Sequence, residues 1–270
     1  MAETARRALS LLGLTERRCV CCREPFEPVS PGGSIASLSE AAVAELFFCP
    51  ACRTAFRRRE AGYCPCCGEP SALEDAPCMP CAACLKKLPP WQDFLFFGIY
   101  EGPLRELMLR AKFHGSLAAL EALGRLLAGV CAGHYEVTNR PDVIIPLPLH
   151  GKRLHERGFN QCRELARPVA EALGVPVRTD MLVKKLALKP QSSLTREERT
   201  ALKQPFAAAR PVDGMHVLLI DDVCTTGATL ARATEALLAA GASRVDAAVL
   251  ARSSRHGNRG SGEGEESVLP

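Results

Sequence analysis

Cysteine is the residue type whose number and spacing point most directly to chemistry in this chain. The 270 residues include 14 cysteines, and eleven of them lie between Cys19 and Cys84. Most of the eleven form four C-x-x-C pairs: Cys19/Cys22, Cys49/Cys52, Cys64/Cys67 and Cys81/Cys84. Structural zinc takes four thiolates in a tetrahedron, and a C-x-x-C turn presents two of them together. Four such turns therefore predict two structural zinc sites.

Two questions about these cysteines stay open at the level of sequence. Sequential pairing of the turns and crossed pairing both satisfy a tetrahedral metal, and Cys78 forms a further C-x-x-C pair with Cys81 that competes for the last ligand set. Cys21 and Cys66 lie inside turns and are predicted to be spare. Disulfides and an iron–sulfur cluster are the alternatives to zinc. Clustered cysteines in a reducing compartment favour a metal over disulfides.

The composition predicts a folded, cytoplasmic protein. Lys and Arg number 34 against 30 Asp and Glu, and 47% of the residues are hydrophobic, which excludes wholesale disorder. The N-terminal residues lack the uninterrupted apolar core of a secretory signal. No apolar run approaches the roughly 20 residues that cross a bilayer, so we expect no membrane insertion. The tail over 253–270 is polar and Gly-rich and is predicted to be disordered.

A strand, a turn of small residues and a helix follow one another between His216 and Thr229. The apolar strand ends in Asp221 and Asp222, and the turn consists of Cys224, Thr225, Thr226, Gly227, Ala228 and Thr229. Backbone N–H groups at a helix N-terminus bind anions, and glycine lets a phosphate approach closely. The carboxylates can accept hydrogen bonds from sugar hydroxyls or reach a bound Mg²⁺. The lysine of a P-loop is absent, and the alternative is an ordinary capped turn.

Strands and helices alternate along the rest of the chain, after a cysteine segment with no long periodicity. We expect strands over 94–100, 143–147, 181–186, 216–220 and 245–250, and helices over 3–14, from Pro103 to a stop at Gly115, and over 117–131, 160–173 and 227–240. Residues 187–206 show little apolar periodicity and are predicted to be a long loop. This alternation predicts an α/β fold with a parallel sheet and crossover helices.

The motif around Asp221 closely resembles the phosphoribosyl pyrophosphate (PRPP) motif of type I phosphoribosyltransferases. With the cysteine pairs included, the chain from about Cys19 to Arg252 resembles the ComF (competence protein F) family, and the segments 100–104 and 112–115 match that family too. The resemblance implies a type I phosphoribosyltransferase-like parallel sheet over 91–252. It also implies a small double zinc-ribbon module over 19–90, preceded by a helix within 1–18.

The same resemblance implies a Mg²⁺-dependent PRPP site. Asp221 and Asp222 would be its catalytic pair and hold the ribose hydroxyls directly or through the metal, while the turn over 224–229 would bind the 5′-phosphate. The pyrophosphate loop would comprise His150, Lys152, Arg153, Arg157, Gly158, Phe159 and Asn160, although a solvated basic loop is the alternative. A flexible hood would carry Gln191, Arg196 and Arg199. The chain departs from the family pattern in this hood, at Leu188 and Ala201.

Three functions are compatible with these motifs. The first is a PRPP-binding ComF-type protein that handles single-stranded DNA in the cytoplasm, alone or with DNA-processing proteins, during DNA uptake. The second is a phosphoribosyltransferase that acts on a small base or amine, and the third is a PRPP sensor without turnover. Basic residues at Arg57–Arg59 and across 142–210 attract phosphates of any kind, so they do not separate these functions. The few aromatic candidates for stacking on single strands are Phe47, Phe48, Phe56 and Trp91.

Overall fold

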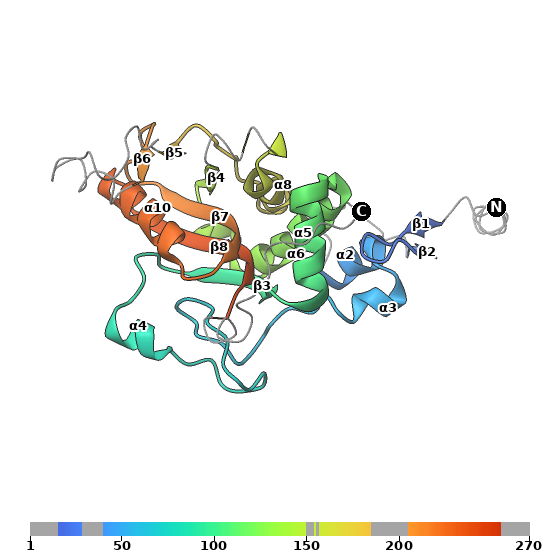
Figure 1. Ribbon diagram of the computed structural model, residues 1–270. Coiled ribbons are helices and arrows are strands. Elements are labelled where there is room, and N and C mark those ends of the chain that lie inside the picture. Colours follow the sequence, from blue (N-terminus) through green and yellow to red (C-terminus); the bar gives the residue numbers. More distant parts are fainter. Residues whose placement is uncertain (1–15, 29–39, 150–153, 155–156, 185–204, 255–270) are drawn as a thin grey trace, which may run out of the picture.

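A four-stranded parallel sheet forms the centre of the computed structural model, which describes residues 16–28, 40–149, 154, 157–184 and 205–254. Its strands are β3 (Phe94–Ile99), β4 (Val143–Pro146), β7 (His216–Cys224) and β8 (Arg244–Arg252). They lie in the order β3-β8-β7-β4, and every neighbouring pair is parallel (Figure 1). The predicted α/β fold with a parallel sheet is therefore confirmed.

The two central strands are longer than the sequence predicts. β7 continues beyond Ile220 through the two aspartates, and Cys224 at its end pairs with Arg252 of β8. Polar residues at strand ends weaken the apolar signal, although the backbone ladder continues through them. The side chains alternate between two separate hydrophobic cores, one on each face of the sheet. Both faces are therefore covered, as in other all-parallel sheets.

Three helices cover one face: α5 (Gly102–His114), α6 (Leu117–His134) and α8 (Gln161–Leu173). Their ends confirm the predicted stops, because Gly115 and Gly174 adopt left-handed C-cap conformations. α6 runs three residues beyond the predicted end at 131. By length and composition it could cross a membrane, but 61% of its residues are buried within the fold. It packs against α8, where Gly124 lies next to Pro168.

The other face carries α10 (Ala228–Ala239) and a small two-stranded antiparallel sheet of β5 (Leu182–Lys184) and β6 (Phe206–Ala208). The sequence did not predict β6, because a three-residue strand has no measurable periodicity. An exposed 3₁₀ turn, η2 (Val137–Asn139), follows α6 and precedes β4 in the sequence. The predicted helix over 3–14, most of the loop over 187–206 and the tail from 255 onward lie outside the described residues.

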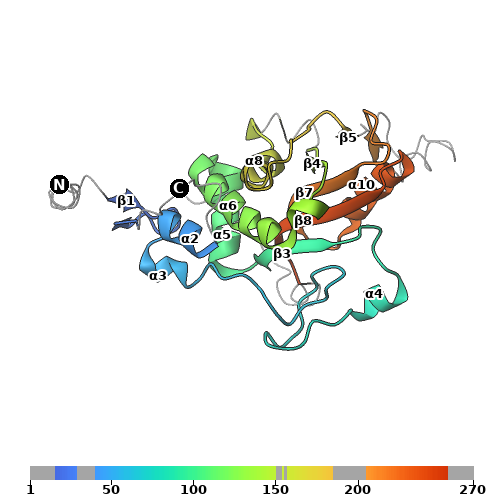
Figure 2. The same ribbon diagram turned by 180° about the vertical axis from the view of Figure 1, so that it is seen from behind.

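The cysteine-rich segment divides between the two faces of the sheet. Its first part contains β1 (Arg17–Arg18), β2 (Pro25–Phe26), α2 (Glu40–Phe47) and α3 (Pro50–Arg53), and it shares the core of α5 and α6. Its second part contains α4 (Ala82–Lys86) and shares the core of α10. Figures 1 and 2 show α2 and α3 beside α5 and α6, with α4 well apart from them. The chain passes from one face to the other along β3, where the Arg59 N–H donates to the Phe97 carbonyl over 2.8 Å.

Candidate functional site

The turn between β7 and α10 gathers all the residues predicted to bind phosphate. β7 ends at Cys224, and Gly227 is the N-cap of α10 with a φ of 79°. Thr225, Thr226, Ala228 and Thr229 are exposed around it. The Ala228 N–H donates to the Thr226 hydroxyl over 3.3 Å. The turn therefore presents small and hydroxyl-bearing residues at the positive end of a helix, an arrangement that attracts anions.

Cys224 lies beneath this turn and not on its surface. Its side chain is buried, and its carbonyl accepts hydrogen bonds from the Ser253 N–H and from the Arg252 guanidinium, each over 2.9 Å. Its sulfur lies 3.7 Å from the position that a Cβ on Gly227 would take. Cys224 therefore supports the turn from inside.

The two aspartates occupy the end of β7 and have different partners. Asp222 is buried, and its Oδ2 accepts from Lys112 Nζ and from Gln161 Nε2, each over 2.9 Å. Asp221 Oδ1 accepts from the Asp222 N–H over 2.8 Å and from the Cys162 thiol over 3.4 Å. Helix α5 therefore supplies one cation to the pair, and α8 supplies two further hydrogen-bond donors.

Burial and the adjacent negative charge of Asp222 raise the pKa of Asp221 to about 7. The same causes, with burial first, raise the pKa of the Cys162 thiol well above its usual value, which keeps this thiol protonated and able to donate. A carboxyl group with a pKa near 7 is only partly ionised at neutral pH. A ligand that brings positive charge or hydroxyl donors to Asp221 favours its ionised form.

Sequence reasoning missed three residues that contact the aspartates: Lys112, Gln161 and Cys162. Lys112 drew attention only as part of a family match, and Gln161 as the residue after the basic loop. Neither position carries a local signal, because both residues lie far from Asp222 in the sequence. Lys112 belongs to α5 and Gln161 to α8. Topology is the one available guide: functional groups of an open parallel sheet meet outside the carboxyl ends of its strands.

The described part of the predicted pyrophosphate loop packs at the start of α8. Asn160 is the N-cap of that helix: its Oδ1 accepts from the Cys162 N–H over 3.0 Å, and its Nδ2 donates to the Leu147 carbonyl over 3.1 Å. Phe159 packs against the core, and Gly158 adopts a φ of 74°. The Arg157 guanidinium lies 5.7 Å from the centre of the Phe113 ring. Outside the described residues lie His150, Lys152 and Arg153 of this loop, and Gln191, Arg196 and Arg199 of the hood.

The eight cysteines of the C-x-x-C pairs form two groups of four, with the sulfurs of each group within 4.8 Å of one another. The first cluster consists of Cys19, Cys22, Cys49 and Cys52, and the second of Cys64, Cys67, Cys81 and Cys84. The turns are thus paired in sequence order, which settles the alternative left open above. Neither group includes Cys21, Cys66 or Cys78. Among the described residues every cysteine is a free thiol.

The dimensions of both clusters fit a tetrahedral metal. A Zn–S bond of about 2.3 Å places the sulfurs of a regular tetrahedron roughly 3.8 Å apart. The sulfurs of Cys22 and Cys49 are 3.6 Å apart, and those of Cys67 and Cys81 are 3.8 Å apart. Each cluster could therefore hold a metal ion such as zinc.

The two clusters repeat one backbone design. In the first, the Cys19 N–H donates to the Glu24 carbonyl over 2.8 Å, and Arg23 is left-handed. In the second, the Cys64 N–H donates to the Glu69 carbonyl over 2.8 Å, and Gly68 takes the left-handed position. Although burial opposes the effect, backbone N–H donors lower the pKa of Cys19 and of Cys64 to about 7. Both turns therefore favour thiolates, the form that binds metal.

Known proteins with similar sequences identify the family. The chain is 32% identical over 178 residues to Competence protein F of Haemophilus influenzae, across 64% of this chain and 78% of that protein. It is 30% identical over 213 residues to Competence protein ComFC of Bacillus subtilis, across 76% of this chain and 84% of that protein. The chain belongs to the ComF family.

Other comparisons agree with the ComF assignment. The DNA utilization protein YhgH of Salmonella typhimurium is 36% identical over 207 residues, across 76% of this chain and 89% of that protein. A family model described as the phosphoribosyl transferase domain matches residues 159–267. A solved glutamine PRPP amidotransferase from B. subtilis aligns with a TM-score of 0.36 and 21% identity over 48% of this chain and 26% of that one. The assignment to the ComF family rests on the relatives.

Proposed function

We propose that this ComF protein is a cytoplasmic PRPP-binding protein, and that the turn over 224–229 and the carboxylates of Asp221 and Asp222 form its PRPP site. The observation that supports this most is their joint position at the carboxyl end of β7, directly before α10. A helix N-terminus with exposed threonines suits a phosphate monoester, and two adjacent carboxylates suit the hydroxyls of a ribose. The match to the phosphoribosyl transferase family model covers this motif.

The donor set also fits Mg²⁺, since this cation takes carboxylate and phosphate oxygens. When bound with PRPP, Mg²⁺ would neutralise charge on the pyrophosphate group. The residues of the chain would orient the ligand. Asp221 and Asp222 orient the ribose, and Lys112 together with Gln161 holds Asp222 in a fixed orientation. Arg157 is the described cation of the predicted pyrophosphate loop.

Calorimetric titration with PRPP and Mg²⁺ tests the proposal. Wild type should bind, the double variant Asp221→Asn/Asp222→Asn should not, and Asp180→Asn, which changes an exposed carboxylate, should bind like wild type. Absence of PRPP binding by folded wild-type protein would overturn the proposal. Pyrophosphate release in the presence of small bases and amines then separates a phosphoribosyltransferase from a sensor without turnover.

We also propose that each cysteine cluster holds one structural zinc ion, because all eight ligands are cysteines and no coordination position is left open. Metal analysis should find two zinc ions per wild-type chain. Cys22→Ser should lower the number to one. A wild-type protein that folds with fewer than two zinc ions would contradict this assignment.

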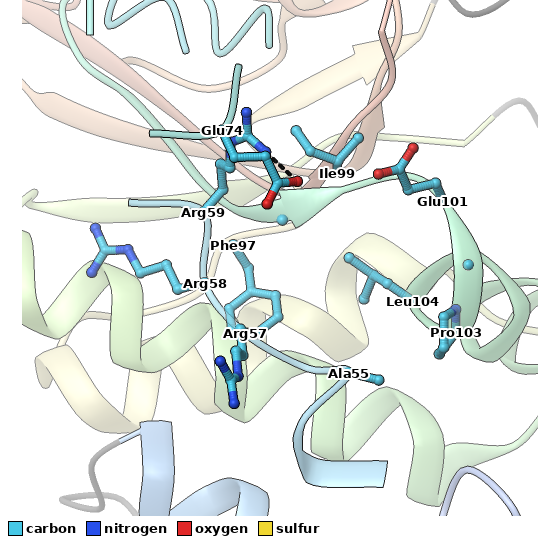
Figure 3. Close-up of a pocket in the computed structure, with 12 residues that line it drawn as sticks. Ala55, Arg57, Arg58, Arg59, Glu74, Phe97, Ile99, Glu101, Pro103 and Leu104 are labelled. Carbon is cyan, nitrogen blue, oxygen red and sulfur yellow. Dashed lines mark ion pairs between the residues drawn. The ribbon is translucent and has the colours of Figure 1, made fainter. Parts of the chain in front are cut away.

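A second candidate function is binding of single-stranded DNA at the edge of the sheet. Two adjoining cavities of about 580 and 470 Å³ lie there and share Arg57 and Arg58. Figure 3 shows the larger of the two. The related proteins named for DNA utilization and competence favour this function. Two of the arginines in the groove are already paired, Arg53 with Glu45 over 3.1 Å and Arg59 with Glu74 over 2.8 Å. Arg57 is exposed and is the first residue we would expect to contact a phosphate.

Three of the aromatic residues that were candidates for stacking on bases are buried. Phe48 and Phe56 stack on each other with their centres 4.2 Å apart, and both are buried. Trp91 is also buried, and it lies away from this groove, at the second cysteine cluster. DNA binding here would therefore depend on the phosphate backbone and would be steeply salt-dependent.

Gel retardation of single strands over a range of salt concentrations tests this candidate. Arg57→Ala/Arg58→Ala should weaken binding and reduce the salt slope by about 1.4, or roughly 0.7 for each lost phosphate contact. Arg167→Ala removes an exposed arginine of α8 and serves as the matched control. An unchanged slope in the double variant would place any DNA contact elsewhere.

A further inference from the structure

Arg252 joins the second cysteine cluster to the candidate phosphate turn. It is fully buried at the end of β8, and its guanidinium donates in both directions. On the cluster side, Nε donates to the Cys67 carbonyl over 2.9 Å and Nη2 to Glu69 Oε2 over 2.5 Å. On the turn side, Nη1 donates to the Cys224 carbonyl over 2.9 Å and also to the Thr225 carbonyl.

These hydrogen bonds set the direction of the turn's N–H groups. In a trans peptide the C=O and the following N–H lie in one plane and point in opposite directions. Because Arg252 holds the carbonyls of Cys224 and Thr225 inward, the N–H groups of Thr225 and Thr226 point away from it. Outward N–H groups on this turn are what a bound phosphate requires.

Trp91 makes a second connection between the same two parts. Its indole Nε1 donates to the Cys66 carbonyl inside the cluster turn over 2.8 Å. Its ring lies against the phosphate turn, since a Cβ on Gly227 would be only 3.1 Å from it. Trp91 also lines a pocket of about 240 Å³ that the cluster segment and the start of α10 form together, so Trp91 and Arg252 both join the two parts.

The first cluster has a different environment. Cys19 and Cys49 belong to the core on the opposite face of the sheet, with Leu107 of α5 and Leu123 of α6. The second cluster belongs to the core that also contains Cys224 and α10. The two clusters therefore share a backbone design but support different parts of the molecule.

We infer that Arg252 and Trp91 are positioning residues, and that metal in the second cluster, but not in the first, sets the geometry and the PRPP affinity of the turn over 224–229. The affinity part of this inference rests on the proposed PRPP site. The geometric part does not, because it concerns hydrogen bonds within the chain.

Hydrogen exchange of the full zinc-loaded chain tests the geometric part without PRPP. Cys81→Ser, which disrupts the second cluster, should speed exchange of the amides over 221–230, whereas Cys22→Ser should leave them unchanged. If Cys81→Ser does not fold, Trp91→Phe replaces it, because this variant keeps an aromatic ring and all cysteines but loses the indole donor. Equal exchange of these amides in the variants of both clusters would overturn the inference, whether or not PRPP binds.

Zinc extraction by a chelator tests the affinity part, because coupling between two sites is reciprocal. In Cys22→Ser, which keeps the second cluster, PRPP with Mg²⁺ should slow extraction at least about fivefold, the lower end of usual coupling. In Cys81→Ser, which keeps only the first cluster, PRPP should not change the rate of zinc extraction. The same should hold in wild type for the zinc ion that is assigned to the first cluster. Added to Cys22→Ser, Arg252→Lys should remove most of the protection, while Arg125→Lys, a buried arginine paired with Glu121 and Glu171, should retain it.

The outcomes separate the two proposals. If wild type fails to bind PRPP, the proposed PRPP site is wrong, and the hydrogen exchange result alone decides the coupling. If wild type binds PRPP but extraction of zinc from the second cluster is not slowed, the inference is wrong and the PRPP site stands. A purely structural role for Arg252 would lower stability without changing the ratio of extraction rates with and without PRPP.

Discussion

Replacement of Lys112 by Met should expose the electrostatic cost of two adjacent buried carboxylates. Lys112 Nζ lies 2.9 Å from Asp222 Oδ2, and the two side chains are only 16% and 10% exposed. At this distance an effective dielectric constant of 20 gives an attraction of about 6 kcal/mol, before desolvation is subtracted. Removing one partner of a buried pair typically costs about 3–5 kcal/mol. Met retains most of the aliphatic stem, so the change isolates the charge.

The sign of the pH dependence follows from Asp221. Burial and the negative charge of Asp222 raise its pKa to about 7, so its contribution to stability is full below about pH 4 and is lost as the pH rises through 7. Without Lys112 this loss becomes larger, because Asp221 then ionises next to Asp222 with no cation beside the pair. The difference between wild type and Lys112→Met should therefore be larger at pH 8 than at pH 4.5.

Thermal unfolding of the zinc-loaded protein measures this difference. About 3 kcal/mol corresponds to a fall in Tm of roughly 6–12 °C at pH 8 for a chain of this size. Asp222→Asn in the Lys112→Met background should restore most of the loss, since the uncompensated charge is then gone. A loss of the same size at pH 4.5 and pH 8, or no recovery in the double variant, would refute the electrostatic reasoning and leave lost packing as the cause.

Three further predictions concern other parts of the fold. Gly227→Ala should weaken PRPP binding at least about tenfold in the calorimetric titration and lower the free energy of unfolding by about 1–3 kcal/mol, because its φ of 79° favours glycine and a Cβ would meet an indole ring. Gly124→Ala should lower Tm, because its Cβ would lie 2.9 Å from Pro168, whereas Gly133→Ala on the exposed side of the same helix should raise it slightly. Burial opposes ionisation of Asp246, but hydrogen bonds from three side chains lower the pKa of this carboxyl group. The stabilisation that Asp246 provides is therefore present above about pH 4 and is lost as the pH falls below that value. Asp246→Asn should lower Tm at pH 7 and make Tm fall less steeply in acid. The three donors are Arg244, Tyr135 and His216.

The sequence could predict the sheet because its signals are local. Buried parallel strands are apolar runs, and glycines in the left-handed conformation end helices, as at Gly115 and Gly174. The phosphate turn is also a local pattern, since its strand, turn and helix are consecutive. The same holds for the ligand pairs of both clusters, because each C-x-x-C turn is a local unit.

The missing parts depend on contacts between distant segments. α2 was not predicted because it lies among turn residues in a segment with no long periodicity. The contact of Lys112 with Asp222 joins α5 to β7, and that of Arg252 with Glu69 spans 183 residues. Neither pair has a spacing that a one-dimensional pattern can show. The order in which the cysteine turns pair is another non-local property, and it was open for the same reason.

The division of the cysteine segment between the two faces has a physical basis in the edge of the sheet. β3 is an edge strand, and its unpaired carbonyls would otherwise be exposed; the backbone at Arg59 satisfies one of them. Crossing there allows one segment to cover both faces next to the same edge. Leu95 and Phe97 then pack with the first cluster, while Phe94 and Phe96 pack with the second. Because alternate side chains of β3 enter different cores, each cluster completes the core on its own face. Disruption of the first cluster and disruption of the second should therefore have different consequences for the sheet and for the turn over 224–229.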